Sequence, residues 1–262
     1  MFVSVKISRI SIARNKIEFL PDSVAVEVFL KVFVNGKPYV TFLASPSMLK
    51  ELIIGNLLSE GIISGLEEIE EIRIDNSKAN VEILKNGETK EKLSGILPLY
   101  CTEGEINKLE KMTKGFRIES DFKIEAKALI ESFKELHRKM SVFRITGCTH
   151  GAALANEEGK IVALAEDLGR HNAVDKVVGY AALKGLDLKS HALLTTGRVT
   201  PLLVLKAATV GIPVVCSSSA ATLSSIRLAK AFNITLAGFV RGNRINIYAN
   251  PQRITLSGQA EI

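Results

Sequence analysis

The fold is decided by the stretch HALLTTGRVTPLLVLKAATVGIPVVCSSS, which covers residues 191–219. Its apolar runs at 191–196 and 212–217 predict two buried strands, and the apolar spacing after Pro201 predicts a helix over 201–210. Two strands joined by a crossing helix form a βαβ unit, in which the strands run parallel. The stretch therefore predicts an α/β fold with helices packed on the faces of a sheet.

Outward from this unit, strands and helices continue to alternate over residues 141–262. The elements predicted around it are a strand at 142–145, a hairpin of 152–155 with 161–165, helices at 172–184 and 222–232, and strands at 234–240 and 244–248. We expect these elements to form a mainly parallel sheet that is covered on both faces.

Residues 1–140 have shorter apolar patterns that indicate an α+β region. The elements predicted there are strands within 3–20 and at 24–34, 39–43, 69–74 and 80–84, and helices at 48–59, from Thr102 to about Lys114, and at 124–140. Asn35-Gly36 predicts a hairpin turn, and Ser45 or Ser47 is expected to cap the helix at 48–59. We therefore divide the chain into a smaller α+β domain, 1–140, and an α/β domain, 141–262.

The composition is typical of a globular protein, because 47% of the 262 residues are hydrophobic and 24% are charged. No apolar run approaches the roughly 18 residues that suggest a membrane span, and the N-terminus lacks the pattern of a signal peptide. Cys101, Cys148 and Cys216 lie far apart and do not form a disulfide framework. We expect a cytoplasmic protein.

The net charge of +6 is confined to residues 141–262, because residues 1–140 hold equal numbers of basic and acidic side chains. The arginines of the C-terminal half stand singly beside glycines, and no lysine-rich run accompanies them. A nucleic-acid surface would show clustered basic residues. The pattern instead favours a compact anionic ligand.

Polar turns follow three of the predicted C-terminal strands, at 195–198, 216–220 and 239–244, and a fourth precedes a helix at 167–172. Because ligands of open α/β sheets bind beyond the carboxyl ends of the strands, we expect a phosphate or purine site there. Arg241 and Arg244 bracket Gly-Asn and repel each other unless an anion or carboxylates intervene.

Several residues of these turns also have structural interpretations. Ser217–Ser219 are candidates for capping the helix at 222–232, and His171 is a candidate structural histidine. Asn172 and Asp175 are open to interpretation as capping and surface residues.

One cysteine stands immediately before a predicted helix. Thr102 and Glu105 have the spacing of a capping box, which places Cys101 just outside the positive end of the helix dipole. That location favours the nucleophilic thiolate. The alternative is that Cys101 packs on Ile106 as a hydrophobic staple.

Motifs for several other chemistries are absent from the sequence. It contains no phosphate-binding loop, no dinucleotide fingerprint, no zinc-deaminase signature and no serine nucleophile elbow. Cys148 and His150 are two residues apart, but no third ligand stands nearby, so we predict no intrinsic metal site.

Several segments in both halves together form a specific pattern. The most specific segment is Glu166–Lys176, which contains Asp167-Leu168-Gly169-Arg170-His171-Asn172. The other segments are Val34–Gly36, Leu57–Ile63, Thr196–Arg198, Gly211–Cys216, Leu236–Gly242 and Asn246–Tyr248. In these segments the chain resembles the formate dehydrogenase accessory sulfurtransferases, the FdhD family.

The resemblance implies that a cysteine desulfurase supplies sulfur, which is carried as a persulfide on Cys101. The sulfur would pass to the molybdenum (or tungsten) bis-pyranopterin guanine dinucleotide cofactor, also called Mo-bis(molybdopterin guanine dinucleotide), which formate dehydrogenase requires. It further implies a cytidine-deaminase-like three-layer α/β/α C-terminal domain without zinc, and a homodimer. The cofactor-binding segment of the family matches Phe239, Val240, Arg241, Gly242, Asn243 and Arg244.

The cysteine loop departs from the pattern of this family. Family members usually read Cys-Gly-x-Cys, whereas this chain reads Cys101-Thr102-Glu103-Gly104 and has glycine at the second cysteine position. One cysteine can hold a persulfide but cannot form a disulfide within the loop. The alternative function is therefore a non-catalytic chaperone of the pterin cofactor that has lost sulfur transfer.

Overall fold

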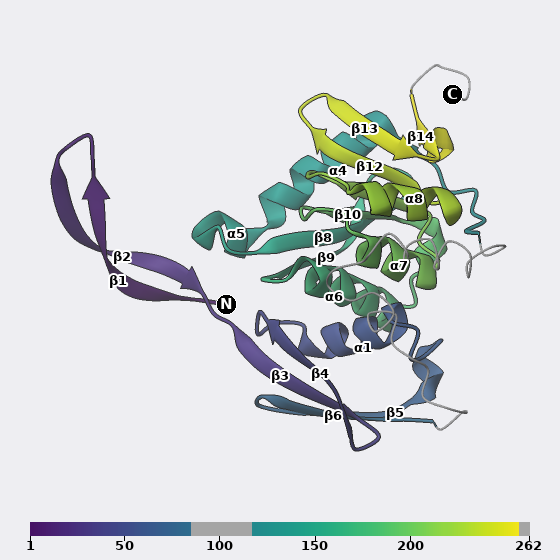
Figure 1. Ribbon diagram of the computed structural model, residues 1–262, viewed down its shortest axis with the longest axis horizontal. Coiled ribbons are helices and arrows are strands. Elements are labelled where there is room, and N and C mark those ends of the chain that lie inside the picture. The colour runs from purple at the N-terminus through teal and green to yellow at the C-terminus, as the bar shows by residue number, and fades with distance from the viewer. Residues whose placement is uncertain (85–116, 257–262) are drawn as a thin grey trace.

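The computed structural model describes residues 1–84 and 117–256 (Figure 1). Cys101 and the helix predicted after it lie outside the described residues. Within the described ranges, a long N-terminal hairpin extends from a body that is built around two sheets (Figure 1).

The larger sheet has six strands in the order β13-β12-β11-β10-β8-β9. Its strands are β8 (His150–Ala155), β9 (Ile161–Asp167), β10 (Ala192–Thr195), β11 (Val214–Ser217), β12 (Thr235–Arg241) and β13 (Arg244–Ala249). Strand β11 is parallel to β10 and β12, whereas the other three pairings are antiparallel. The prediction of a mainly parallel sheet is therefore wrong. Two hairpins, β8–β9 and β12–β13, add antiparallel pairs on either side of the parallel centre.

Helices cover both faces of this sheet, so the mixed α/β fold is confirmed. Helices α6 (Arg170–Leu183), α7 (Pro201–Thr209) and α8 (Leu223–Ala231) pack on one face, and α4 (Ala126–Lys139) packs on the other. Alternate residues of the strands supply the two cores: Leu193 and Val215 face the first, and Leu194 and Val214 the second. The domain boundary after residue 140 stays a prediction, although α4, which precedes it, packs on this sheet.

The smaller sheet has the order β4-β3-β6-β5 and packs against α1. Its elements are β3 (Val28–Val34), β4 (Lys37–Ala44), α1 (Leu49–Ser59), β5 (Ile69–Asp75) and β6 (Lys78–Ile83). The predicted strand at 24–34 is divided at residues 26–27. The N-cap of α1 is Met48 (φ 55°) rather than Ser45 or Ser47. Ser45 instead bonds to the C-terminal half, through Asp167 and Lys176.

Helices α1 and α6 touch along their backbones and join the two sheets. A Cβ atom added to Gly55 would lie 1.7 Å from the carbonyl oxygen of Asp175. A Cβ atom added to Gly179 would lie 2.0 Å from the carbonyl oxygen of Glu51. Only glycine permits this approach, so the two residues fix how the halves pack.

The strand predicted at 142–145 is wrong, because Ser141–Thr146 form the short helix α5. The Glu166 carboxylate accepts the amides of Val142 and Phe143, at 3.1 and 2.8 Å, and so satisfies two orphan donors of the first turn. Gly147 ends the helix with a positive φ of 68°. The helix thus depends on a carboxylate more than 20 residues away in the sequence.

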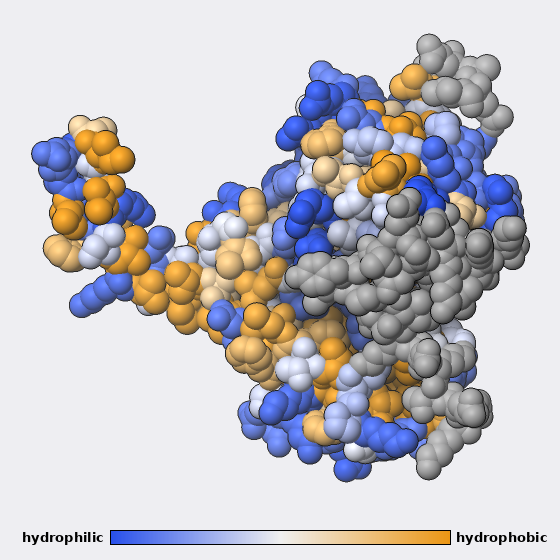
Figure 2. All heavy atoms as spheres, in the orientation of Figure 1, coloured by the Kyte–Doolittle hydropathy of each residue, from blue (hydrophilic) through white to orange (hydrophobic). Residues whose placement is uncertain are grey.

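The N-terminal hairpin consists of β1 (Phe2–Ser11) and β2 (Lys16–Ala25), which pair only with each other. It is an extended arm whose surface carries many apolar side chains (Figure 2). Ile12 and Phe19 are 91% and 84% exposed. The remaining short elements are β7 (Ile124–Glu125), β14 (Ile254–Thr255), η1 (Leu66–Glu68), η2 (Leu188–Ser190) and η3 (Pro251–Arg253).

Candidate anion site at one edge of the sheet

One edge of the six-stranded sheet collects the polar turns singled out in the sequence. Strand β9 is antiparallel to β8, and β8 is antiparallel to β10, so β9 runs in the same direction as β10, β11 and β12. Their carboxyl ends therefore meet at a single edge, together with the amino ends of β8 and β13. Helices α6, α7 and α8 each begin after one of these strand ends.

The turn after β9 is held by Asp167, which is fully buried. Its carboxylate pairs with Lys176 at 2.5 Å and accepts the amides of Ser45 and Gly169. Asn172 donates to the same carboxylate and to the carbonyl oxygen of Leu43. Asp167 and Asn172 are therefore structural residues that fix the start of α6 against the N-terminal half.

Arg170 is the first residue of α6 and lies against the turn after β10. A Cβ atom on Gly197 would come within 2.6 Å of Cβ of Arg170, so the Arg170 stem crosses directly over this glycine. The next residue in the turn is Arg198, which is exposed. Burial and the nearby Arg198 lower the pKa of Arg170. Two cationic side chains thus project from adjacent turns.

Two histidines near these arginines are held neutral. Burial, Arg170 and Arg198 lower the pKa of His150. Burial, Arg170 and Lys206 lower the pKa of His171 to about 3, and its Nε2 lies 3.1 Å from Oγ1 of Thr200. His171 is thus a partly buried neutral residue, consistent with its structural interpretation.

A pocket of about 320 Å³ opens at the same edge, between α5 and the ends of β10 and β11. Its polar lining includes Cys148, His150, Thr196 and Ser218. Thr196 accepts the Gly151 amide through Oγ1, which leaves its hydroxyl proton available for a ligand. Cys148 is exposed, whereas Cys216 is buried and burial raises the pKa of its thiol.

The predicted cofactor segment Phe239–Arg244 spans the end of β12, the turn at Gly242 and Asn243, and the first residue of β13. Its Val240 is buried in the core and does not face a ligand at the surface. Arg241 and Arg244 face each other across the ladder, and Gly242 turns the chain with φ 60°. The Arg241 guanidinium lies 5.2 Å from the centre of the Phe239 ring, a cation–π contact. Both arginines are exposed, so they present two positive charges to solvent at the end of the sheet.

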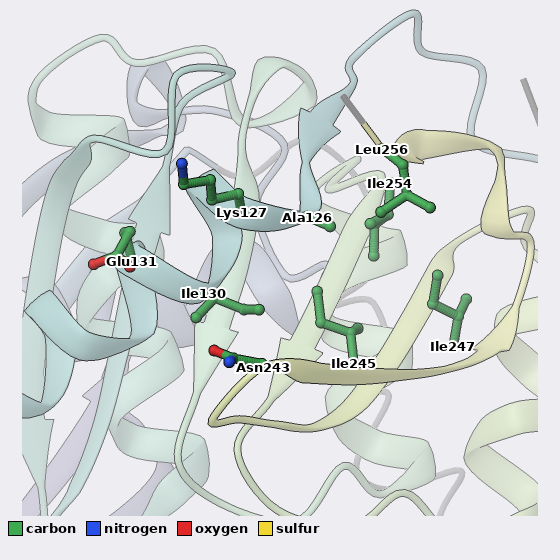
Figure 3. A pocket seen from close by; sticks show the side chains of 9 residues that line it. All are labelled: Ala126, Lys127, Ile130, Glu131, Asn243, Ile245, Ile247, Ile254 and Leu256. Atoms are coloured by element: carbon green, nitrogen blue, oxygen red, sulfur yellow. The ribbon is translucent and has the colours of Figure 1, made fainter. Parts of the chain in front are cut away.

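An apolar groove of about 480 Å³ runs beside this turn, between α4 and β13 (Figure 3). Ile130 enters it from α4 and Ile245 from β13, while Asn243 lies at its margin (Figure 3). Its walls offer apolar contact to a flat ring, and the residues that line it do not include Arg241 or Arg244.

The structure thus brings Phe239–Arg244 to the same sheet edge as the turns at 167–172 and 195–198. The sequence placed His150 in a turn after a predicted strand at 142–145, whereas in the structure His150 is the first residue of β8 and reaches this edge from there. The sequence also left Asp175 open to interpretation as a surface residue. In the structure Asp175 is buried, and its carboxylate accepts hydrogen bonds from Asn56, Ser59 and Lys206.

Comparison with known proteins identifies the family to which this arrangement belongs. A family model described as the FdhD/NarQ family matches residues 25–255. The chain is 34% identical over 246 residues to the sulfur carrier protein FdhD of Bacillus subtilis. This match covers 92% of this chain and 94% of the relative. The chain belongs to the FdhD/NarQ family.

Other FdhD/NarQ relatives agree with this assignment. A protein of Thermoplasma acidophilum named sulfur carrier protein FdhD is 37% identical, over 89% of this chain and 87% of the relative. A crystal structure from Desulfotalea psychrophila, described as a formate dehydrogenase accessory protein, matches with a TM-score of 0.80. That protein is 27% identical and the match covers 97% of this chain and 99% of the other. No helix among the residues described here is long and apolar enough to cross a membrane.

Proposed function

We propose that this FdhD-family protein is a sulfur carrier that serves the maturation of formate dehydrogenase. The observation that carries the proposal is the family match over residues 25–255, to relatives that are named sulfur carrier proteins. The basic sheet edge supports the proposal, because a carrier that serves an anionic cofactor needs a positively charged binding surface.

Sulfur would be carried on Cys101, which lies outside the described residues. A cysteine desulfurase is the proposed donor. The Cys101 thiolate attacks the outer sulfur of the donor persulfide, so a new sulfur–sulfur bond forms at Cys101 while the donor leaves as a thiolate. In the delivery step the sulfur–sulfur bond would break, the reduced metal of the cofactor would supply the two electrons that convert the outer sulfur to sulfide, and Cys101 would leave as a thiolate.

The cargo we propose is the molybdenum (or tungsten) bis-pyranopterin guanine dinucleotide cofactor. Phe239–Arg244 would hold its nucleotide end. The residues fit such a ligand, because Arg241 and Arg244 are like charges on opposite strands, an unfavourable pair that an anion would stabilise. The groove beside Asn243 offers apolar walls for a base.

The N-terminal arm supports a further element of this proposal, the homodimer. A two-stranded hairpin is at best marginally stable in water without a third layer. Ile10, Ile17 and Phe19 lie on one face of the arm and are 60% exposed or more. Much of the surface of the arm is apolar, and the arm extends away from the body (Figure 2). A second copy of the chain, available whenever the protein folds, would cover this face. We place the dimer in the cytoplasm, where cysteine desulfurases and the client would meet it.

Persulfide transfer is tested by incubating the full chain with a cysteine desulfurase and cysteine, followed by mass spectrometry of the intact protein and its peptides. We expect one added sulfur on Cys101. Cys101→Ser should abolish both this modification and the activation of formate dehydrogenase. Cys148→Ser is the control, since Cys148 is an exposed thiol, and it should retain both. Sulfur found only on Cys148 would refute the assignment of Cys101.

Cys101→Ser and a further variant, Arg241→Gln, together test the alternative chaperone function. If Cys101→Ser still activates formate dehydrogenase while Arg241→Gln does not, the chain binds the cofactor without carrying sulfur. That result would remove sulfur transfer from the proposal and retain cofactor binding.

A further inference from the structure

A second pair of arginines, Arg170 and Arg198, lies at the sheet edge outside the predicted cofactor segment. Strand β10, which leads to Arg198, is separated from β12, which leads to Arg241, by one strand. With about 5 Å between neighbouring strands, the two arginine pairs start about 10 Å apart. They are therefore separate positive regions along one edge.

The Arg170–Arg198 pair has no acidic partner among residues 1–84 and 117–256. No carboxylate within those ranges forms an ion pair with either guanidinium. The acidic residues on either side, Glu166 and Asp167, direct their oxygens to α5 and to Lys176. The charge that acts on Arg170 is thus the repulsive one of Arg198.

Arg170 also carries an unsatisfied donor. Its Nε is the one buried side-chain nitrogen or oxygen in the described part of the chain that has no hydrogen-bond partner. A buried donor without an acceptor destabilises the folded state, because it loses its hydrogen bond to water and gains none in return. The stem cannot easily move to relieve this, because it lies against Gly197 and α6 begins at Arg170.

The surroundings of the pair supply further hydrogen-bond donors. The edge at this point is formed by the first turn of α6, whose amides point outward, and by the hydroxyl of Thr196. Ser218 lines the adjoining pocket, and its hydroxyl has no hydrogen bond to another described residue. Guanidinium forks, amides and hydroxyls together are the ligand set of phosphate oxygens.

We propose that Arg170 and Arg198 form a binding site for a phosphate or diphosphate group, distinct from Phe239–Arg244. An oxyanion there accepts the orphan Nε–H of Arg170 and neutralises the repulsion between the two guanidinium groups. The site itself is independent of sulfur transfer. The identity of its natural ligand rests on the proposed function, whose cargo has two diphosphate groups, one for each arginine pair.

The experiment is isothermal titration of the full chain with inorganic pyrophosphate and, separately, with GDP, at low and at physiological ionic strength. We expect wild-type protein to bind two pyrophosphate ions per chain. Arg170→Gln and Arg198→Gln should each remove one of them or weaken it at least tenfold, and Arg241→Gln should affect the other. Arg73→Gln is the matched control, because Arg73 is an exposed arginine on β5, and it should bind as wild type.

Thermal unfolding without ligand separates this proposal from a structural role for the arginines. If no group of the protein neutralises the pair in the absence of an anion, Arg170→Gln and Arg198→Gln keep or raise the melting temperature, because each variant removes the repulsion between the two guanidinium groups. If a carboxylate elsewhere in the chain already neutralises the pair, both variants melt at lower temperature and pyrophosphate binding is unchanged. That outcome would overturn the proposal, as would equal loss of binding in Arg73→Gln.

These outcomes are distinguishable from failure of the proposed function. Persulfide formation on Cys101 is measured in the absence of any phosphate, so it can succeed when pyrophosphate fails to bind. If pyrophosphate binds at Arg170 and GDP does not, the site takes a free phosphate group rather than a nucleotide, and the link to the cargo is refuted.

Discussion

Lys206 is buried between two carboxylates, and its replacement by methionine gives the sharpest test of what holds the two halves together. Its ammonium lies 2.9 Å from Asp175 and 2.9 Å from Glu60, and it donates to Ser59. Lys206, Asp175 and Glu60 are only 2%, 1% and 4% exposed. Burial alone lowers the pKa of Lys206, but Asp175 and Glu60 raise it above its ordinary value, so the lysine is charged.

Lys206→Met keeps the volume and removes the charge, which leaves two buried carboxylates facing each other. Removing one partner of a buried ion pair costs about 3–5 kcal/mol. For a chain of this size, 1 kcal/mol changes the melting temperature by about 2–4 °C, so the expected loss is about 6–20 °C. Differential scanning calorimetry and urea unfolding at neutral pH measure it. Lys230→Met is the control, because Lys230 is exposed, and should change little.

Asp175→Asn shows whether the cost of Lys206→Met comes from the unpaired buried carboxylates. This variant leaves Lys206 paired with Glu60, so we expect a smaller cost, about 1–3 kcal/mol for the hydrogen bonds that an amide cannot accept. The double variant should be no less stable than Lys206→Met, because it leaves one buried carboxylate instead of two. A larger loss for Asp175→Asn than for Lys206→Met would refute this reasoning.

Three further changes have defined outcomes. The pKa of His171 is about 3 in the folded protein and about 6.5 in the unfolded chain, so below pH 6.5 the unfolded chain binds a proton that the folded protein does not. The free energy of unfolding therefore falls as the pH decreases from 6.5 toward 3, by about 2 kcal/mol at pH 5. His171→Gln should remove this pH dependence of the melting temperature. Gly179→Ala forces a methyl group against the Glu51 carbonyl and should cost about 3 kcal/mol or more in urea unfolding, whereas equal stability would show that α1 can move away. Ile17→Ser with Phe19→Ser should shift a dimer toward monomer in sedimentation velocity, and an unchanged sedimentation coefficient would contradict pairing through the arm.

The sequence predicted the elements of the C-terminal sheet well, because their burial is encoded locally. Pro201 at the start of α7 and the apolar runs on either side of it identify one βαβ unit within a few residues of its observed bounds. The hairpin of β8 and β9 was also predicted. Strand direction was not, because the pairing of β8 with β10 joins segments that are 40 residues apart and leaves no local pattern.

The wrong predictions share a physical cause: side chains distant in the sequence determine the secondary structure or the burial of the residue concerned. Val142, Phe143 and Ile145 favour a strand by composition, and the Glu166 carboxylate makes them helical. Asp175 has no neighbour in sequence that indicates Lys206, so its burial could not be foreseen. Similarly, the turns that hold Arg170 and Arg198 were each predicted at the sheet edge, but their contact depends on Gly197.

The contact of α1 with α6 has a consequence for how the chain can be divided. A fragment that begins at residue 141 would retain Lys206 and Lys176 but lose Glu60, Ser59 and the Ser45 carbonyl, which satisfy them. It would also expose the bare backbone at Gly179. Such a fragment should not fold alone, and the intact chain should unfold in a single calorimetric transition. A single transition would mean that the change of architecture between the two halves lies within one cooperative unit, and that a half taken from a relative has to bring a helix that fits α1 or α6.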